Sequence, residues 1–318
     1  MPPIKLALVG LGKIARDQHL PALAANPDYQ LIALVSRSIH EQQALTAVFP
    51  EAKLFTDLDQ LLASGLEIDA VSLCAPPQVR HAQAARALAA GCDVMLEKPP
   101  GSGINDVQAL IHQAERHGQV LFATWHSRYA PQVEPARAWL ESKRVIALKV
   151  SWREDVRHWH FNQEWVWQPG GLGVFDPGIN ALSIVTRLLP DGLYLTKARL
   201  DFPSNRQTPI AARLEGALAG RASGPVEIEL DWLKTGEQSW DIEIGTDQGR
   251  IELTHGGSRM LIDGEQIAVA GEQEYPGLYA RFSELVARRK SDVDLTPLAL
   301  AADAFLLGER REVDAFEW

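Results

Sequence analysis

Short apolar runs alternate with amphipathic stretches along the first third of the chain. The apolar runs predict strands, and the stretches with apolar residues three or four positions apart predict helices. Single helices between consecutive strands indicate βαβ units with parallel strands and right-handed crossovers. The runs are apolar on both faces, as in a sheet that is covered on both sides. Strands are predicted at 4–10, 30–36, 70–75, 93–98 and 119–125, and helices at 57–64, 81–90 and 105–117.

The pattern changes after about residue 125, where apolar and polar residues alternate strictly. IALKVSWR (146–153) and VEIELDWL (226–233) show this period of two, which places Trp152 and Trp232 at buried positions. One buried and one wet face indicate a mostly antiparallel sheet. Asp-Gln-Gly at 247–249 and Asp-Gly at 263–264 are hairpin signals. The sequence therefore predicts two domains, a doubly wound parallel α/β domain over 1–124 and an α+β domain over 125–318, built on an open, mostly antiparallel sheet.

Composition narrows the class of protein. The 318 residues carry a net charge of -10, which argues against a nucleic-acid partner. No apolar run approaches the ~18–20 residues that cross a bilayer, so no membrane partner is expected. The start, MPPIKLALVG, enters a strand pattern at once without a basic leader. Cys74 and Cys92 lie in or beside apolar runs, as reduced thiols of a cytoplasmic protein do.

A glycine loop closes the first predicted strand and opens a helix. Gly10 permits a tight turn, and Gly12 lets the backbone approach a pyrophosphate. The loop continues through Lys13 and Ile14 to Ala15, which lets helix and strand pack closely. The helix N-terminus offers free N–H groups to the anion. A tight turn without a ligand is the alternative, but the strand–loop–helix context favours dinucleotide binding in a Rossmann domain.

The residues after the second strand bear on which dinucleotide is bound. An NAD site usually has Asp or Glu here, whereas this chain has Ser36 and Arg37. Ser36 can donate a hydrogen bond to a phosphate, and Arg37 can pair with it or stack on adenine. The alternative is that Arg37 is a solvated loop residue. We predict NADP as the preferred cofactor, with NAD as the second choice.

Several segments resemble the glucose–fructose oxidoreductase/inositol dehydrogenase family. They are the glycine loop, Ala75-Pro76-Pro77 with His81, the run AARALAAGCDVMLEKP, and GGLGVFDPGIN. The stretch SWREDVRHWHF is similar to the aldose 1-dehydrogenase branch of that family. The resemblance implies an NAD(P)-dependent sugar dehydrogenase. It also implies that the cofactor contacts Cys74, Ala75, Pro76, Pro77, His81, Glu97 and Lys98.

Lys98 ends a predicted parallel strand, at the edge where open α/β sheets bind ligands. Pro99 pushes Lys98 out of the helical region, and the bond between them is a candidate for the cis form. By the resemblance, the ammonium lies near the nicotinamide ribose and the reacting hydroxyl, where it stabilises a developing alkoxide. The alternative is a lysine that pairs with Glu97 at the strand end.

Asp176 and Asn180 are four residues apart and share a predicted helix face. The family usually has Asp and His at these positions. Asn180 cannot act as a base, so we expect Asp176 to accept the proton, directly or through Lys98, and Asn180 to orient a sugar hydroxyl. The alternative is that Asp176 is an N-cap and Pro177 the first helical residue.

Further sugar contacts follow from the same resemblance. Glu154 and His160 are expected to bind ring hydroxyls, and Trp159 to cover an apolar sugar face. His126 follows a strand and is a candidate for the same site, with a core or capping role as the alternative. His158 and His160 lack a third ligand at metal-site spacing, so no metal is predicted.

The predicted reaction is oxidation of an aldose of the L-arabinose or D-galactose type at carbon 1, which yields the aldonolactone. One alternative is an inositol or other secondary-alcohol dehydrogenase of the family, although Asn180 in place of His argues against it. A second alternative is a sensor that binds NADP without catalysis. A homodimer through the second domain's sheet is a further expectation from the resemblance.

Overall fold

The computed structural model describes residues 2–38, 45, 48–220, 224–267, 271 and 273–318. They form two compact units. Unit 1 comprises Met1–Thr124 and Tyr275–Asp294, and unit 2 comprises Trp125–Glu274 and Leu295–Trp318. The predicted boundary assigned residues 275–294 to the second domain, but most of helix α9 (Glu274–Arg288) lies in unit 1. In the described part of the chain, no helix combines the length and the apolar character that crossing a bilayer requires.

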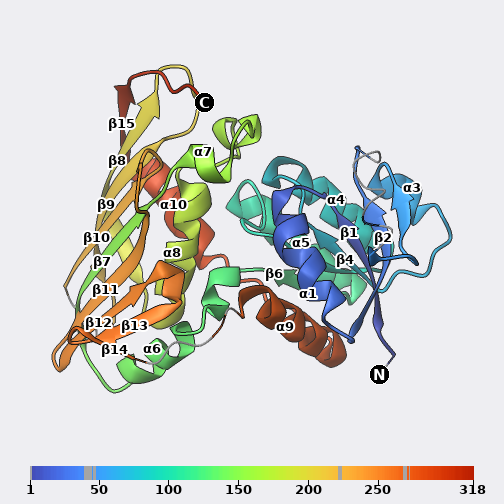
Figure 1. The fold of residues 1–318 in the computed structure, drawn as a ribbon, viewed down its shortest axis with the longest axis horizontal. Coiled ribbons are helices and arrows are strands. Elements are labelled where there is room, and N and C mark those ends of the chain that lie inside the picture. The colour runs from blue at the N-terminus through green and yellow to red at the C-terminus, as the bar shows by residue number, and fades with distance from the viewer. Residues whose placement is uncertain (1, 39–44, 46–47, 221–223, 268–270, 272) are drawn as a thin grey trace. The chain divides into compact units, whose positions relative to one another are not determined.

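Unit 1 contains a six-stranded parallel sheet with the order β3-β2-β1-β4-β5-β6, which confirms the doubly wound α/β prediction (Figure 1). All residues of β4 and β5 are buried, as expected for strands covered on both faces. The three-residue strand β3 was not predicted. The strands are β1 (Ile4–Val9), β2 (Tyr29–Val35), β3 (Lys53–Phe55), β4 (Ala70–Leu73), β5 (Asp93–Leu96) and β6 (Leu121–Ala123).

The helices of unit 1 connect these strands as the apolar pattern predicted. A π-helical turn, η1 (Ala15–His19), continues into α1 (Leu20–Ala24). The others are α3 (Leu58–Leu62), α4 (Pro77–Ala89) and α5 (Ile104–His117). Strands β1 and β4 are neighbours whose connections run in opposite directions, so the sheet's topological switch point lies between them. The loops after β1, β2, β4 and β5 all leave from the carboxyl edge of the sheet.

Unit 2 contains a nine-stranded sheet with the order β14-β13-β12-β11-β7-β10-β9-β8-β15. Among the described residues of this sheet, only the pairs β7–β10 and β8–β15 are parallel, which confirms a mostly antiparallel sheet. Both predicted hairpins form, between β11 and β12 and between β13 and β14. The strands are β7 (Val145–Arg153), β8 (Leu193–Pro203), β9 (Ala211–Leu218), β10 (Pro225–Asp231), β11 (Ser239–Thr246), β12 (Gly249–Thr254), β13 (Arg259–Ile262), β14 (Glu265–Gln266) and β15 (Gly308–Val313).

Helices cover one face of this sheet (Figure 1). They are α6 (Val133–Leu140), α8 (Phe175–Leu188) and α10 (Thr296–Leu307). Leu148, Val150 and Trp152 of β7 are buried on that face, as the alternation predicted, whereas Ile146 is 40% exposed at the strand's start. Lys149 on the opposite face is exposed. The remaining helical segments are His126–Tyr129 (η3), Val156–Trp159 (α7), Glu164–Trp167 (η4) and His255–Gly257 (η5).

Candidate active site

The two glycines of the loop after β1 are required for different reasons. Gly10 has φ +89°, and a Cβ there would lie 2.6 Å from the backbone nitrogen of Ala75. A Cβ on Gly12 would meet no protein atom within 4 Å. Packing within the chain therefore explains Gly10, while the open space at Gly12 fits the close approach of a pyrophosphate. Ala15 is buried at the start of the helix, as predicted.

The loops after β4 and β5 are tied together by Arg80, a buried residue of α4. Its guanidinium donates hydrogen bonds to the carbonyl oxygens of Ala75 and Glu97, each at 2.5 Å, and to that of Pro99. The peptide bond between Lys98 and Pro99 is cis. Arg80 fixes the backbone around Lys98, and sequence reasoning missed it because an arginine on a helix carries no signal of burial.

Glu97 lies in a buried network within unit 1. Tyr275 donates to its Oε1 at 2.7 Å, and His19 Nε2 is 3.4 Å from the same atom. The backbone N–H of Lys98 donates to Oε2. The other ring nitrogen of His19 lies 2.8 Å from the hydroxyl of Tyr279. These partners fix the Glu97 side chain against α9, a role that the sequence did not suggest.

The ionisation of His19 reflects this network. Burial alone lowers the pKa of His19, but Cys74, Tyr279 and Glu97 around it raise that pKa well above its ordinary value. A carboxylate beside a buried imidazole favours the protonated ring. His19 therefore balances the negative charge that Glu97 brings into the interior of unit 1.

The other residues predicted to bind the cofactor lie at the same edge of the sheet. Ser36 and Arg37 follow β2, and Arg37 is exposed. Lys13, at the start of the first helix, pairs with Asp17 one turn later. His81 on α4 places its Nδ1 3.0 Å from the backbone oxygen of Asp106. Cys74, Ala75, Pro76 and Pro77 form the turn between β4 and α4.

In unit 2, Glu154 is a buried carboxylate that follows β7. The indole N–H of Trp232 donates to its Oε1 at 3.2 Å, and that of Trp240 donates to its Oε2 at 2.8 Å. Trp159 packs edge-on against Trp240 and donates to Gln238 at 3.0 Å. Two indole donors can hold a carboxylate away from water with little loss of hydrogen bonding. Trp240 was not predicted as a site residue.

His160 and Asp176, predicted separately, meet in unit 2. His160 Nε2 lies 3.3 Å from Asp176 Oδ2. His160 Nδ1 lies 3.2 Å from Oε1 of Gln163, and Trp165 donates to that same oxygen at 3.1 Å. Asp176 is only 2% exposed. An imidazole against a buried carboxylate is an arrangement suited to proton transfer.

A strained loop positions Asp176 at the start of α8. Leu172 has φ +68°, a left-handed conformation that costs a leucine about 1–3 kcal/mol. A Cβ on Gly171 would lie 2.1 Å from the backbone oxygen of Trp165, so only glycine allows this approach. Helix α8 begins at Phe175 with Val174 as its N-cap, so the alternative reading of Asp176 as an N-cap is wrong. Asn180 lies one turn later and is half-buried.

His126 has partners of its own in unit 2. Its Nδ1 lies 2.5 Å from Oε2 of Glu274 and 3.3 Å from the hydroxyl of Ser127. These contacts favour the structural role that the sequence left open for His126. Among the described residues, no group of three or more His, Cys, Asp or Glu side chains is placed to hold a metal ion.

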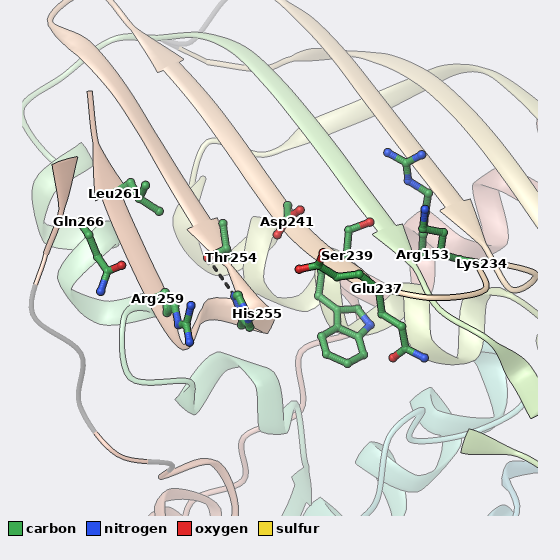
Figure 2. Close-up of a pocket in the computed structure, with 12 residues that line it drawn as sticks. Arg153, Lys234, Glu237, Ser239, Asp241, Thr254, His255, Arg259, Leu261 and Gln266 are labelled. Atoms are coloured by element: carbon green, nitrogen blue, oxygen red, sulfur yellow. Dashed lines mark hydrogen bonds between the residues drawn. The ribbon is translucent and has the colours of Figure 1, made fainter. Parts of the chain in front are cut away.

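A pocket of about 750 Å³ lies at the end of the sheet of unit 2 (Figure 2). Arg153, Asp241 and Arg259 are among its lining residues. Burial raises the pKa of Asp241 above its ordinary value, although His255 lowers it in part. Trp240 and Gln238 also line the pocket, and they contact Glu154 and Trp159. The pocket therefore adjoins the predicted sugar-binding residues.

Comparisons with known proteins identify chains of similar sequence and fold. The sequence model of a family described as "Oxidoreductase family, NAD-binding Rossmann fold" matches residues 4–124. Galactose 1-dehydrogenase of Pseudomonas fluorescens is 42% identical over 318 residues, which cover 99% of each chain. The crystal structure of D-galactose-1-dehydrogenase from Rhizobium etli is 50% identical, with a TM-score of 0.91 and coverage of 100% of this chain and 99% of the other.

A more distant structure shares the fold alone. KijD10, a 3-ketoreductase from Actinomadura kijaniata solved with NADP and TDP-benzene, has a TM-score of 0.85 and 17% identity. The match covers 98% of this chain and 99% of that one. The order of strands described above is therefore kept in proteins whose sequences have diverged widely.

Proposed function

This chain belongs to the glucose–fructose oxidoreductase/inositol dehydrogenase family of NAD-binding oxidoreductases, and from that premise we propose that it oxidises a galactose-type aldose at carbon 1. The product is the aldonolactone. The observation that carries the proposal is the buried Asp176 carboxylate beside His160, in a chain similar along its whole length to two galactose 1-dehydrogenases. L-Arabinose has much of the ring stereochemistry of D-galactose, and we expect it to react as well.

We propose NADP as the preferred cofactor. The turn at Gly10 and the open space at Gly12 fit a dinucleotide. The proposed contacts are Gly10, Gly12, Lys13, Ile14, residues 74–77 and His81. Ser36 and Arg37 stand where an NAD site usually has a carboxylate that repels the 2′-phosphate. Arg37 is exposed and therefore accessible to such a phosphate. The cofactor, when bound, supplies the acceptor for the hydrogen and electron pair of carbon 1.

The predicted catalytic residues are proposed to act on one hydroxyl of the sugar. Asp176 accepts the proton of the anomeric hydroxyl, which is more acidic than that of a simple alcohol. Lys98 stabilises the negative charge that develops on the oxygen. Asn180, Glu154 and Trp159 orient the sugar, and His160 and His126 are the remaining candidates for that role. For Glu154, the two indole donors hold its two oxygens in fixed positions, which supports a role in binding a sugar hydroxyl.

The test is a substrate panel with the reduced cofactor measured by absorbance. We expect turnover of D-galactose and L-arabinose with NADP, and none of inositols or of methyl galactosides, which lack a free anomeric hydroxyl. Lys98→Met should lower kcat by about 10²–10³-fold, because the charge on the oxygen loses its partner. Oxidation of inositols at comparable rates would contradict the proposal. Cofactor binding without turnover of any sugar would favour a sensor instead.

We also propose that two copies associate through the uncovered face of the sheet of unit 2. This face carries acidic and basic residues in adjacent rows, so a two-fold axis can set one sign against the other. Ion pairs on it include Lys149–Glu243, Arg213–Glu229 and Arg153–Glu229, at 3.5–3.8 Å. Light scattering should give a dimer mass, and Glu229→Arg with Glu243→Arg should reduce it to that of a monomer. A monomeric parent protein would end this proposal.

The cytoplasm is the proposed location. Cys74 and Cys92 are both free, and burial raises the pKa of Cys92 to about 11, which keeps it as an unreactive thiol. Free thiols persist in a reducing compartment. Cell fractionation with an antibody to the native protein tests this proposal.

A further inference from the structure

We propose that His160 stores the proton that Asp176 takes from the substrate, and that Gln163 and Trp165 fix the His160 ring in the tautomer that this requires. The inference deepens the proposed function and rests on it, because it assigns the fate of the proton released during oxidation. It changes the role of His160 from a hydroxyl ligand to a proton acceptor.

The two ring nitrogens of His160 lie near different partners. Gln163 Oε1 lies 3.2 Å from His160 Nδ1 and 3.1 Å from the indole nitrogen of Trp165. His160 Nε2 faces Asp176 Oδ2 at 3.3 Å. The imidazole also packs against the ring of Trp232, with the ring centres 5.3 Å apart. Each nitrogen of His160 thus has a polar partner, and the ring has aromatic neighbours.

The donors and acceptors allow one assignment. An indole N–H can only donate, so the atom of Gln163 that faces Trp165 must be the amide oxygen. That oxygen can only accept, so His160 Nδ1 must carry a proton. In the neutral ring Nε2, which lies 3.3 Å from Asp176 Oδ2, therefore has the lone pair.

This assignment makes the pair a proton acceptor. A neutral imidazole is a stronger base than a carboxylate, so a proton that Asp176 accepts can pass on to Nε2 of His160, 3.3 Å away. The protonated ring and the carboxylate then form a charge-assisted contact.

With this assignment, each proton and electron pair of the oxidation has an acceptor. The O–H bond of the anomeric hydroxyl breaks, and its proton passes through the Asp176 carboxylate to Nε2 of His160. The C–H bond at carbon 1 breaks, its electron pair leaves with the hydrogen to NADP, and the C–O bond becomes the lactone carbonyl. The pair must then release its proton before the next turnover. The His160 side chain is 17% exposed, which gives it access to water.

Other charged groups of the described part of unit 2 lie near His160. Glu154 is held by Trp232, whose ring packs on the imidazole. Glu164 on η4 accepts from Arg206 and Trp318. Asp155 pairs with Arg157 on α7. Of the acids described in unit 2, Asp176 is the one that forms an ion pair with the imidazole, with its Oδ2 3.3 Å from Nε2.

Two substitutions at Gln163 test the inference, because they act on the proton in opposite directions. Gln163→Glu places a negative charge at Nδ1, which favours the protonated ring, so the acidic limb of the kcat–pH profile should move up by about one pH unit. Gln163→Leu removes the acceptor, so the limb should move down and kcat should fall by about tenfold. KM for the sugar should change little in both. Gln113→Leu, which removes a half-buried glutamine of unit 1 that donates to Ala85, is the matched control and should leave the profile unchanged.

The tautomer itself can be measured without turnover. Nitrogen NMR of labelled histidines, with the His160 signals assigned from His160→Gln, should show a protonated Nδ1 in the parent protein. Trp165→Phe and Gln163→Leu should populate the other tautomer while melting temperatures show that both variants fold. A parent ring protonated only at Nε2 would overturn the inference.

The two proposals fail in different ways. An absence of turnover with every aldose would overturn the proposed function, and the assignment of the proton with it. Turnover of galactose with the two Gln163 variants shifting in the same direction, or not at all, would overturn the inference alone.

Discussion

The candidate cofactor site of unit 1, in the loops after β1, β4 and β5, is formed mainly by backbone groups. The carboxylate cluster of unit 2, Glu154 and Asp176 with His160, is formed by side chains that aromatic residues hold in place. In unit 1, Gly10 allows the backbone to pass Ala75, and Arg80 donates to three carbonyl oxygens. In unit 2, Trp232 and Trp240 hold Glu154, and Trp165 acts on His160 through Gln163.

The difference fits what each unit is proposed to recognise. A pyrophosphate needs N–H groups and space, which loops and a helix end supply without particular side chains. A reacting hydroxyl needs a base in one position, and a buried carboxylate is kept charged only by well-placed donors. A Cβ added to the backbone should therefore damage unit 1, while loss of a ring or a carboxylate should damage unit 2.

The largest effect is expected for Asp176→Asn. The amide has the same shape as the carboxylate but accepts no proton, so kcat should fall by about 10²–10⁴-fold. Steady-state kinetics with D-galactose and NADP measure it. Asp59→Asn, an exposed acid of unit 1 that pairs with Arg86, is the control and should keep kcat. An Asp176→Asn enzyme with unchanged kcat would show that unit 2 does not depend on this carboxylate, and the contrast between the two units would fail.

The next largest effect is expected on stability, from removal of the Phe316 ring, which packs behind Trp167 and Trp232. Phe316 is 3% exposed and packs on Trp167, which packs on Trp232. Phe316→Ala should lower the free energy of unfolding by about 3–5 kcal/mol, since it leaves a cavity. Urea denaturation measures this. Phe161→Ala removes a ring that is 61% exposed and should change stability far less. Equal effects would show that the aromatic packing matters little.

The glycine loop gives a paired test in unit 1. Gly10→Ala forces a Cβ against the backbone at Ala75 in a left-handed conformation and should cost about 1–3 kcal/mol of stability. Gly12→Ala meets no protein atom and should keep stability within about 0.5 kcal/mol, yet weaken cofactor binding. Thermal melting and titration with NADPH separate the two. Unchanged NADPH binding in Gly12→Ala would contradict a pyrophosphate at this position.

The smallest effect is a pH dependence in unit 1. Because the folded pKa of His19 is raised, its stabilising contribution is fully present below about pH 6.5, the ordinary value, and is lost as the pH rises through the folded pKa. Stability should therefore decline on the alkaline side. His19→Gln should flatten this decline in denaturation curves recorded across pH. A decline of the same slope in the variant would assign it to another group.

The fold was predicted well because its signals are local, and the same signals placed the candidate cofactor residues of unit 1. Gly10, Ser36, Cys74 and Glu97 each directly follow a strand, so recognising the strands places them at one edge. The pairs of unit 2 have no such signal. Glu154 and Trp240 are 86 residues apart, and nothing in the alternating pattern distinguishes Trp240 from another strand residue.

Two further features lay beyond sequence reasoning for a physical reason. Helix α9 has an ordinary amphipathic pattern. Its place in unit 1 follows from contacts that the pattern does not reveal, such as the hydrogen bonds from Tyr275 to Glu97 and from Tyr29 to Tyr279. The pairing of His160 with Asp176 depends on the strained turn at Leu172, and no residue type announces such a turn. The resemblance to the family predicted a role for His160 and a role for Asp176, but it did not predict that the two side chains lie close together.

The way in which Arg80 fastens the loops after β4 and β5 has a practical consequence for redesign. Ser36 is not among the residues that Arg80 contacts, since its hydrogen bonds are to Phe55 and Ser38. Positions 36 and 37 can therefore be substituted to change the preference between NADP and NAD without disturbing the loops that Arg80 holds. Lys98, which we propose to act on the reacting hydroxyl, would keep its backbone position, because Arg80 holds the carbonyl oxygens of Glu97 and Pro99 on either side of it.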